Sequence, residues 1–418
     1  MRIVFIESSL QEASLRIPGV TTRTEDLPSL LSRIPDPEVR ALFSPEFILC
    51  AEHFDRFTVE MVLRTVASLG IAEDLARGTT VRGLVANRSY APRAAVPLEW
   101  FLRKLAAEGY LDADRPGAEA LFRARGPLPP GDPDRAEAAA RALDPRSMPP
   151  FTVVRAMAEH IPAFLKGERT GEDILFSPTK LPLWFDYFSN ENLLYAINNR
   201  LGAEAVVRAL PATRPATIVE IGGGSGSAAL ALAERLARDA SLPRIARYRF
   251  SEIVPTFLRR AERAIRARFP DLPIEFSKVD MDRDFTQQGI PEGEADVFYA
   301  VNTVHIARDL GATLKRIRRA VKPGGAVVFS ECVRPFPDQP IYVEFVFNFL
   351  ENFTGVATDP DTRPTHGFLS PENWRRSLTA AGFTHVQILP DVESLARHYD
   401  AFFVAAVTAR RDGSSQKG

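Results

Sequence analysis

Residues 217–226, TIVEIGGGSG, constrain the fold of this chain more than any other segment. An apolar run ends in the acidic Glu220 and leads straight into glycines, and residues 227–237 then carry the apolar spacing of a helix. A strand, a tight glycine turn and a helix in this order open a Rossmann-like nucleotide-binding sheet. The segment therefore predicts a doubly wound α/β fold that binds a nucleotide-like cofactor at Gly222, Gly224 and Gly226.

The charge of Glu220 discriminates between the cofactors that such a turn accommodates. Glycine amides and a helix N-terminus favour a pyrophosphate, which a carboxylate at the mouth of the turn would repel. S-adenosylmethionine has no phosphate and carries an ammonium and a sulfonium, so the same carboxylate attracts it. The glycines alone also satisfy the dinucleotide pattern G-x-G-x-x-A. On the charge we predict S-adenosylmethionine, with S-adenosylhomocysteine as product, rather than NAD.

Three segments beyond the glycine turn carry a family resemblance. They follow one another as YRFSEIVPTFL (248–258), FSKVDMDRD (276–284) and ADVFYAVNTVHIARDLGATLKRIRRAVKPGGAVVFSE (295–331). Together they resemble class I S-adenosylmethionine-dependent methyltransferases, and the last resembles the carbon-methylating domains of polyketide synthases and their free-standing relatives. The resemblance implies that Glu252 holds the ribose hydroxyls and that Asp280 and the Met281 backbone face the adenine. Asn302 is a further residue that we expect at the cofactor.

Two side chains at the ends of predicted strands are candidates for the chemistry. His305 follows a strand predicted at 297–301, and Glu331 ends the next one, at 326–330. Ligands lie at the carboxyl ends of strands in a doubly wound sheet, and neighbouring strands are about 5 Å apart. We predict that His305 is a general base, because histidine titrates near neutral pH, and that Glu331 orients its ring. A helix-start histidine satisfied by a backbone carbonyl is the non-catalytic alternative.

A base at this position favours an acceptor with an acidic carbon, whose enolate attacks the sulfonium methyl in line. We predict an enzyme of specialised, polyketide-type metabolism that methylates the activated α-carbon of a β-keto or thioester-like acceptor. That acceptor is either a free small molecule or an acyl group tethered to a carrier protein. An O-methyltransferase for a phenol or enol hydroxyl is the alternative, but HIARDL at 305–310 departs from the His-Asp-Trp usual in winged-helix O-methyltransferases.

The candidates for contact with the acceptor are aromatic, amide or imidazole side chains in two segments. Residues 174–202 are too rich in aromatics for an ordinary linker, and the resemblance places a lid over the cofactor there. The apolar underside of a helix packed on the core is the alternative interpretation. The second segment, 342–374, contains an apolar run predicted as a helix that roofs the site. The candidates are Trp184, Tyr187, Asn198, Asn348, Asn352 and His366.

Residues 1–150 carry the pattern of a winged helix. Helical patterns at 54–76, from residue 79 and at 96–107 precede two short predicted strands, GYLDAD and ALFRARG. The last of these helices contains only Arg103 and Lys104 as basic residues, and Glu99 and Glu108 oppose them. This balance favours dimerisation and shaping of the substrate site over insertion in a DNA major groove. A non-catalytic, DNA-binding regulator is the alternative of another class, against which His305 and Glu331 both argue.

The predicted architecture is a Rossmann-like methyltransferase core with a mainly helical, winged-helix N-terminal domain. We divide the chain into the N-terminal domain (1–150), a helical lid or linker (151–210), the methyltransferase domain (211–409) and a disordered tail (410–418). The resemblance implies a homodimer.

Composition bounds the remaining partners. The formal net charge of −1 gives no long-range attraction to nucleic acid or to an anionic membrane. The dispersed histidines and the two cysteines give no metal-ligand spacing, so we expect a metal-free site. We find neither a signal peptide nor an apolar run of membrane length, and we therefore expect a cytoplasmic protein.

Overall fold

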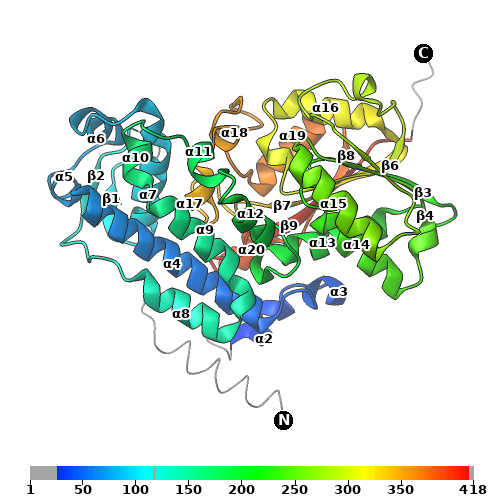
Figure 1. Cartoon of the computed structure of the whole chain (residues 1–418). Helices are drawn as coiled ribbons and strands as arrows, with labels where there is room; N and C mark the ends of the chain where they lie inside the picture. Colours follow the sequence, from blue (N-terminus) through cyan, green and yellow to red (C-terminus); the bar gives the residue numbers. More distant parts are fainter. Residues whose placement is uncertain (1–25, 116–118, 414–418) are drawn as a thin grey trace, which may run out of the picture.

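The computed structural model describes residues 26–115 and 119–413. In Figure 1 a helical region formed by the first part of the chain lies beside a seven-stranded sheet with helices on both faces. Residues 1–25 of the predicted N-terminal domain and 414–418 of the predicted tail lie outside the described residues. Within the described ranges, no helix has both the length and the apolarity to cross a membrane.

The sheet has the strand order β5-β4-β3-β6-β7-β9-β8. Its strands are β3 (Ala216–Glu220), β4 (Ile245–Ser251), β5 (Ile274–Ser277), β6 (Ala295–Val301), β7 (Val321–Cys332), β8 (Thr384–Leu389) and β9 (Val404–Arg410). The first five are parallel, and β9 runs antiparallel between β7 and β8. Strand β6 is buried along its whole length, as expected for a parallel strand covered on both faces. The doubly wound α/β fold predicted from the glycine turn is confirmed.

The order of strands brings two strand ends together at the centre of the sheet. Strands β6 and β7 are neighbours, with Val301 opposite Ser330 in the register. Strand β3 lies on the other side of β6, with Glu220 opposite Tyr299. The carboxyl ends of β3, β6 and β7 are therefore adjacent, and the residues that follow them meet at one edge of the sheet.

Helices cover the sheet in two layers. On one face, α13 (Leu193–Ala209), α14 (Ser227–Arg238) and α15 (Pro255–Arg268) bury apolar side chains against β3, β4 and β6. On the other face, α16 (Leu310–Ala320) packs on β6 and β7, and α19 (Pro371–Ala380) packs on β8. Helix α14 begins at Ser227, directly after the glycine turn, where the sequence predicted it.

The helical region is built around one long helix. Its elements are α2 (Leu27–Ser32), α3 (Pro37–Arg40), α4 (Pro45–Leu69), α5 (Ala72–Arg77), α6 (Val81–Asn87), α7 (Ala95–Ala107), β1 (Leu111–Ala113), β2 (Phe122–Ala124), α8 (Pro133–Leu143) and α9 (Met148–Ala158). The helix predicted at 54–76 is α4, which begins earlier, at Pro45, and ends earlier, at Leu69. Ser44 caps its first turn by accepting from the Phe47 amide, and Gly70 ends it in a left-handed conformation, φ 64°.

The two basic residues of α7 are held in ion pairs. Lys104 is buried, with its Nζ 2.8 and 2.9 Å from the carboxylate oxygens of Asp55 and 3.1 Å from Glu108. Arg103 lies 2.9 Å from Glu99 on the same helix. Strands β1 and β2 pair antiparallel next to α7. Neither cation is therefore an unpaired charge on the surface of this helix.

Short helices lie between the helical region and the sheet (Figure 1). They are α11 (Gly171–Leu175), α12 (Leu181–Tyr187), α17 (Glu344–Phe347) and α18 (Glu351–Thr354), whereas α10 (Ile161–Leu165) lies within the helical region. The apolar run at 342–353, predicted as one helix, is in fact two. Leu350 takes an extended conformation, φ −101° and ψ 130°, because it is the residue that caps the start of α18. Helix α20 (Val392–Ala396) follows β8.

The last strand of the sheet extends into the tail predicted at 410–418. Arg410 closes β9, and the Arg411 guanidinium donates to the carbonyls of Arg318, Arg319 and Val321. Residues 410 and 411 are therefore fixed by the sheet and by the end of α16. The physical reason is that backbone pairing with β7 continues to Ala326, opposite Arg410.

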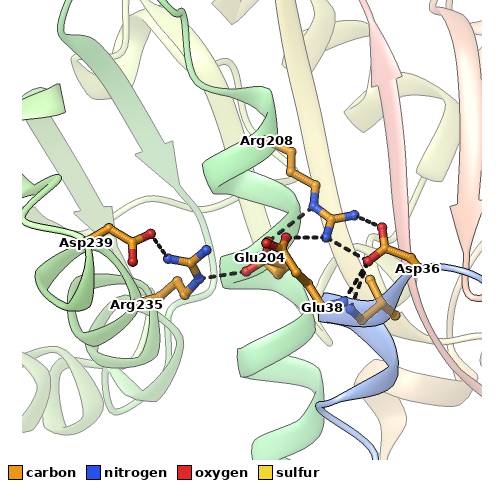
Figure 2. A network of polar contacts seen from close by, with 7 residues as sticks. Asp36, Glu38, Glu204, Arg208, Arg235 and Asp239 are labelled. Carbon is orange, nitrogen blue, oxygen red and sulfur yellow. Dashed lines mark hydrogen bonds and ion pairs between the residues drawn. The ribbon is translucent and has the colours of Figure 1, made fainter.

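A network of charged side chains joins the helical region to the sheet layer (Figure 2). Arg208 on α13 contacts Asp36 and Glu38 at the start of α3, and it also contacts Glu204 one turn earlier on its own helix. Glu204 accepts in addition from Arg235 on α14, at 2.7 Å. The network therefore spans α3, α13 and α14.

Candidate active site

The turn between β3 and α14 is shaped by glycines with left-handed backbone. Gly222, Gly224 and Gly226 have φ angles of 60°, 55° and 90°. An added Cβ at Gly222 would lie 2.2 Å from the Thr303 hydroxyl, so this residue is fixed by close packing. An added Cβ at Gly224 would meet nothing within 4 Å, and Gly224 lines a cavity. The turn is thus closely packed at Gly222 and open to the cavity at Gly224.

Gly226, which the sequence predicts at the cofactor, does not line this cavity. An added Cβ there would come within 3.0 to 3.2 Å of Ala261 and Ile265 on α15. Its role in the structure is the close approach of α14 to α15. The other two predicted glycines line the cavity wall.

Glu220 lies at the end of β3 and is fully buried. The Tyr248 hydroxyl donates to its Oε2 at 2.6 Å, and its Oε1 has no hydrogen-bond partner among the described residues. Burial raises the pKa of this carboxyl to about 8, although the Tyr248 hydrogen bond acts in the opposite direction. Glu220 also lines the cavity. The unpartnered Oε1 can accept a hydrogen bond from a cationic group of a ligand.

Glu252 follows β4 and holds the glycine turn from the side. Its Oε2 accepts from the Gly224 amide at 2.9 Å, and its Oε1 accepts from the Val254 amide at 2.8 Å. Burial raises the pKa of this carboxyl, and these backbone amides lower it. Each oxygen retains a second lone pair, and the side chain lines the cavity. It can therefore accept hydrogen bonds from a ligand's hydroxyl groups.

Three further predicted cofactor residues line the same cavity. Asp280 follows β5 and accepts from the Asp282 amide at 2.9 Å, and Met281 comes next in the chain. Asn302 follows β6 with a left-handed φ of 47°, and its Oδ1 accepts from the Cys332 amide at 2.9 Å. Asn302 thereby joins the ends of β6 and β7. The residues after four parallel strands thus face one cavity.

His305 and Glu331 meet at the ends of β6 and β7. The His305 Nδ1 lies 2.6 Å from the Glu331 Oε2, and both side chains are buried. The Glu331 Oε1 accepts from the amides of Val304, at 3.0 Å, and Thr303, at 3.3 Å. Because the carboxylate accepts, Nδ1 is the donor, and Nε2 is left as the proton acceptor. His305 lines the cavity, so this arrangement can remove a proton from a bound molecule.

The cavity has a volume of about 390 Å³ and extends from the glycine turn to an aromatic wall. The His305 ring itself contacts two aromatic rings that also contact each other, with centroid distances of 4.4 Å to Phe368 and 5.8 Å to Phe353. The other rings of the wall come from the helical region, from α12 and α13, and from the segments after β7. They include Phe54, Phe176, Trp184, Tyr187, Phe188, Tyr195, Tyr342, Phe347 and Phe403.

Four of the six predicted acceptor residues line this cavity: Trp184, Tyr187, Asn198 and Asn352. The Oδ1 of Asn198 is buried without a partner among the described residues. The two others, Asn348 and His366, do not line the cavity. They contact each other instead, with 3.2 Å between the His366 Nε2 and the Asn348 Oδ1. Asn348 caps the end of α17, and this position turns its amide toward His366.

Sequence reasoning missed two kinds of residue. Tyr248 reads as an ordinary apolar residue of β4, and only the fold brings its hydroxyl to Glu220. Phe54 and Tyr342 come from distant segments and contact each other at the wall, with ring centroids 5.0 Å apart. No local pattern marks these residues, because their partners are far away in the sequence.

Within the described residues, no group of three acidic, histidine or cysteine side chains gathers to hold a metal ion.

Comparison with known proteins finds a family model that matches part of this chain. The model of the methyltransferase domain family matches residues 195–388. A highly reducing polyketide synthase of Dothideomycetidae sp. (strain 11243) is 27% identical over 275 residues, which are 64% of this chain and 10% of that protein. Another highly reducing polyketide synthase, from Emericella nidulans, is 33% identical over 172 residues, 41% of this chain and 6% of that protein. The chain therefore spans a tenth or less of the length of these relatives.

Solved structures resemble this one over most of its length. The CurJ carbon methyltransferase has a TM-score of 0.72 at 20% identity and covers 93% of this chain and 97% of its own. The DszA carbon methyltransferase has a TM-score of 0.69 at 21% identity, with 94% and 97% covered. The CMeT domain of the citrinin polyketide synthase has a TM-score of 0.67 at 18% identity, with 98% of both chains covered. At these identities the likeness shows a shared fold.

Proposed function

We propose that this chain, which contains a methyltransferase domain at residues 195–388, transfers a methyl group from S-adenosylmethionine to an activated α-carbon. The acceptor is a β-keto or thioester-like acyl compound of polyketide-type metabolism. The observation that carries the proposal is the 2.6 Å hydrogen bond between His305 and Glu331, in the wall of the cavity into which the glycine turn opens. The names of the similar proteins, carbon methyltransferases and polyketide synthases, support the carbon acceptor.

The residues around the glycine turn fit the methyl donor. When bound, S-adenosylmethionine supplies an electrophilic methyl group on a sulfonium, which needs no activation by the protein. The unpaired Oε1 of Glu220 suits its ammonium group, and the open position at Gly224 leaves room beside the turn. Glu252 suits the ribose hydroxyls, and the Asp280–Met281 segment suits the adenine. Asn302 lines the same cavity as these groups and His305.

The chain's own residues then prepare the acceptor. His305 Nε2 takes the proton from the α-carbon, and Glu331 holds the ring by its Nδ1–H and stabilises the imidazolium that forms. Two backbone amides hold the other oxygen of Glu331, so the carboxylate keeps one orientation. The aromatic wall excludes water and packs on the apolar part of the acceptor. Positioning of the enolate in line with the methyl group supplies most of the acceleration.

The test is the position of an isotopic label. The purified chain is incubated with methyl-deuterated S-adenosylmethionine and a panel of β-ketoacyl thioesters and phenols, and the products are analysed by mass spectrometry. We expect label on the α-carbon of a thioester. Label on a phenolic oxygen would assign the chain to O-methylation with the same base. No label from any acceptor, in a protein that binds S-adenosylhomocysteine, would refute the proposed acceptor class.

The same assay tests the base. His305→Ala is expected to abolish turnover and to leave the affinity for S-adenosylhomocysteine unchanged, because the imidazole is proposed to contact the acceptor. His398→Ala is the matched control, since His398 is an exposed histidine that does not line the cavity. Wild-type turnover in the His305 variant would remove this mechanism.

A further inference from the structure

A buried arginine holds the turn that carries His305. Arg363 lies in the loop between α18 and α19 and is 2% exposed. Its Nη1 donates to the Ala307 carbonyl at 2.8 Å, and its Nη2 donates to the His305 carbonyl. Its Nε has no hydrogen-bond partner among the described residues, and no described carboxylate forms an ion pair with it. The cation is thus bound by two neutral carbonyls of one short turn.

The burial of this guanidinium has an energetic cost. Removing a guanidinium from water costs free energy that two carbonyl acceptors recover only in part. Burial accordingly lowers the pKa of Arg363 to about 10, although Glu331 opposes this effect. An apolar side chain such as methionine would avoid that cost, but it would leave the carbonyls of His305 and Ala307 without these donors. The two hydrogen bonds to the His305 turn are therefore what this buried cation supplies.

The loop that carries Arg363 is itself rigidly held. Arg363 and Asp359 exchange backbone hydrogen bonds of 2.8 and 2.9 Å, and the Asp359 carboxylate accepts from the amide of Thr362 at 2.9 Å. The Ser377 hydroxyl on α19 donates to the Thr362 carbonyl at 3.1 Å. The guanidinium is therefore presented from a loop that is anchored to the sheet layer through α19.

The same loop contacts the turn at a further carbonyl. The Ala357 amide donates to the Arg308 carbonyl at 2.7 Å. Together with the two bonds from Arg363, it holds the carbonyls of His305, Ala307 and Arg308 from one side. On the other side, Glu331 binds the His305 ring and the amides of Thr303 and Val304. The His305 turn is clamped between β7 and the loop at 357–363.

We propose that Arg363 is a positioning residue, which fixes the 305–308 turn so that His305 keeps its hydrogen bond to Glu331 and presents Nε2 to the cavity. The consequence for turnover rests on the proposed function, but the clamping of the turn does not. Arg363 touches neither donor nor acceptor, since it does not line the cavity. Its loss should therefore lower kcat and spare the binding of the cofactor.

The matched control is an arginine with the same chemistry at the other end of the sheet. Arg411 also donates to backbone carbonyls, those of Arg318, Arg319 and Val321, where β7 begins. Arg363→Met and Arg411→Met each remove an arginine that fixes a backbone turn, but only the first touches the turn of His305. Arg363→Lys retains a charge with a shorter reach and tests partial recovery.

Three measurements are made on the full chain: backbone hydrogen exchange by mass spectrometry, affinity for S-adenosylhomocysteine, and kcat and KM. We expect Arg363→Met to accelerate exchange in the peptide covering 303–310 and to lower kcat by one to two orders of magnitude, since small misplacements cost about 100-fold. Affinity for S-adenosylhomocysteine and KM should remain near their wild-type values. Arg363→Lys should recover part of kcat, and Arg411→Met should change exchange only around its own contacts.

The outcomes separate the two ideas. Unchanged exchange at 303–310 in Arg363→Met, or a kcat equal to that of Arg411→Met, would overturn the role of Arg363. If Arg363→Met does not fold, the same comparison is made with Arg363→Lys and Arg411→Lys. Faster exchange at 303–310 in a protein whose wild type labels no acceptor would support the clamp and refute the proposed function instead.

Discussion

At the scale of the residue, both carboxylate oxygens of Glu331 accept hydrogen bonds, and donors face them on both sides. Its Oε2 faces the His305 Nδ1, and its Oε1 faces the amides of Thr303 and Val304. An amide in this place would turn an NH₂ group toward one of these donors. Glu331→Gln therefore either leaves the Thr303 and Val304 amides without their acceptor or makes the His305 Nδ1 the acceptor, which places the proton on Nε2.

We expect Glu331→Gln to lower the free energy of unfolding by about 1–3 kcal/mol, the usual cost of a buried polar group without its partner. Turnover should fall more steeply than stability, because the imidazolium loses its counter-charge. Urea denaturation and the labelling assay measure the two effects. Glu372→Gln on the surface of α19 is the control, and equal effects of both substitutions would contradict the argument.

The raised pKa of Glu220 leads us to predict that the affinity for the cofactor depends on pH. Burial raises its pKa from 4.5 to about 8 in the folded protein, so the folded state holds this proton more tightly than the unfolded chain. Its contribution to stability is thus fully present below about pH 4.5 and is lost as the pH rises through about 8. An ammonium group requires the ionised form. Binding of S-adenosylhomocysteine should therefore release a proton.

We expect the affinity for S-adenosylhomocysteine to increase as the pH rises from 6.5 toward about 8, where Glu220 ionises. Calorimetry in buffers of different ionisation enthalpy measures the proton released. Glu220→Gln should bind more weakly and lose both effects. Titration of the ligand's own amine is the same for both proteins and cancels in their comparison. Equal proton release by wild type and variant would show that another group titrates.

At the scale of the element, the glycine turn allows the effect of backbone strain on stability to be distinguished from the effect of an added side chain on ligand binding. Gly224 and Gly324 both have left-handed φ angles, 55° and 81°, and an added Cβ would meet nothing within 4 Å at either position. Only Gly224 lines the cavity. An alanine at either site should cost about 1–2 kcal/mol of stability, the usual penalty for a left-handed L residue. Only Gly224→Ala should also weaken binding of S-adenosylhomocysteine, and calorimetry tests this difference.

The elements at the centre of the sheet could be predicted from sequence, and those over the cavity could not. The strand, turn and helix around 217–237 are local patterns, and sheet order then brings His305 to Glu331. The roof at 342–353 was predicted as one helix, because apolar spacing does not reveal that Leu350 is extended. The pairing of Asn348 with His366 and the clamp by Arg363 are contacts between distant segments, which no local pattern encodes.

At the scale of the whole molecule, the helical region and the sheet both contribute to the wall of the cavity and contact each other beside it. Phe54 on α4 lies in the cavity wall together with residues from the ends of the parallel strands. The Trp100 indole on α7 donates to Glu344 on α17 at 3.0 Å, and Arg334, two residues beyond β7, contacts the same carboxylate. Any motion of the helical region should therefore change the cavity. The charged network of Figure 2, on the later part of α13, resists such motion.

Glu204 is the centre of that network, and its replacement should lower the free energy of unfolding more than the replacement of Asp36. Glu204 is buried between Arg208 and Arg235, whereas the side chains of Asp36 and Arg208 are 30% and 36% exposed. Glu204→Gln removes the charge that faces two guanidinium groups, and we expect it to cost about 1–3 kcal/mol in urea denaturation. Asp36→Asn should cost less than about 1 kcal/mol, because water and salt screen an exposed pair.

The dependence of the unfolding free energy on pH in acid tests the same network. The Arg208 hydrogen bond lowers the pKa of Asp36 from 3.8 to about 2, so its contribution is present above about pH 3.8 and is lost as the pH falls through about 2. The difference in unfolding free energy between wild type and Asp36→Asn should therefore shrink over this window, and it should shrink at neutral pH when 1 M salt is added. A difference that is constant with pH and salt would contradict a contribution of Asp36 through its ion pair with Arg208, because asparagine retains the cap on α3 that Asp36 forms with the Glu38 and Val39 amides.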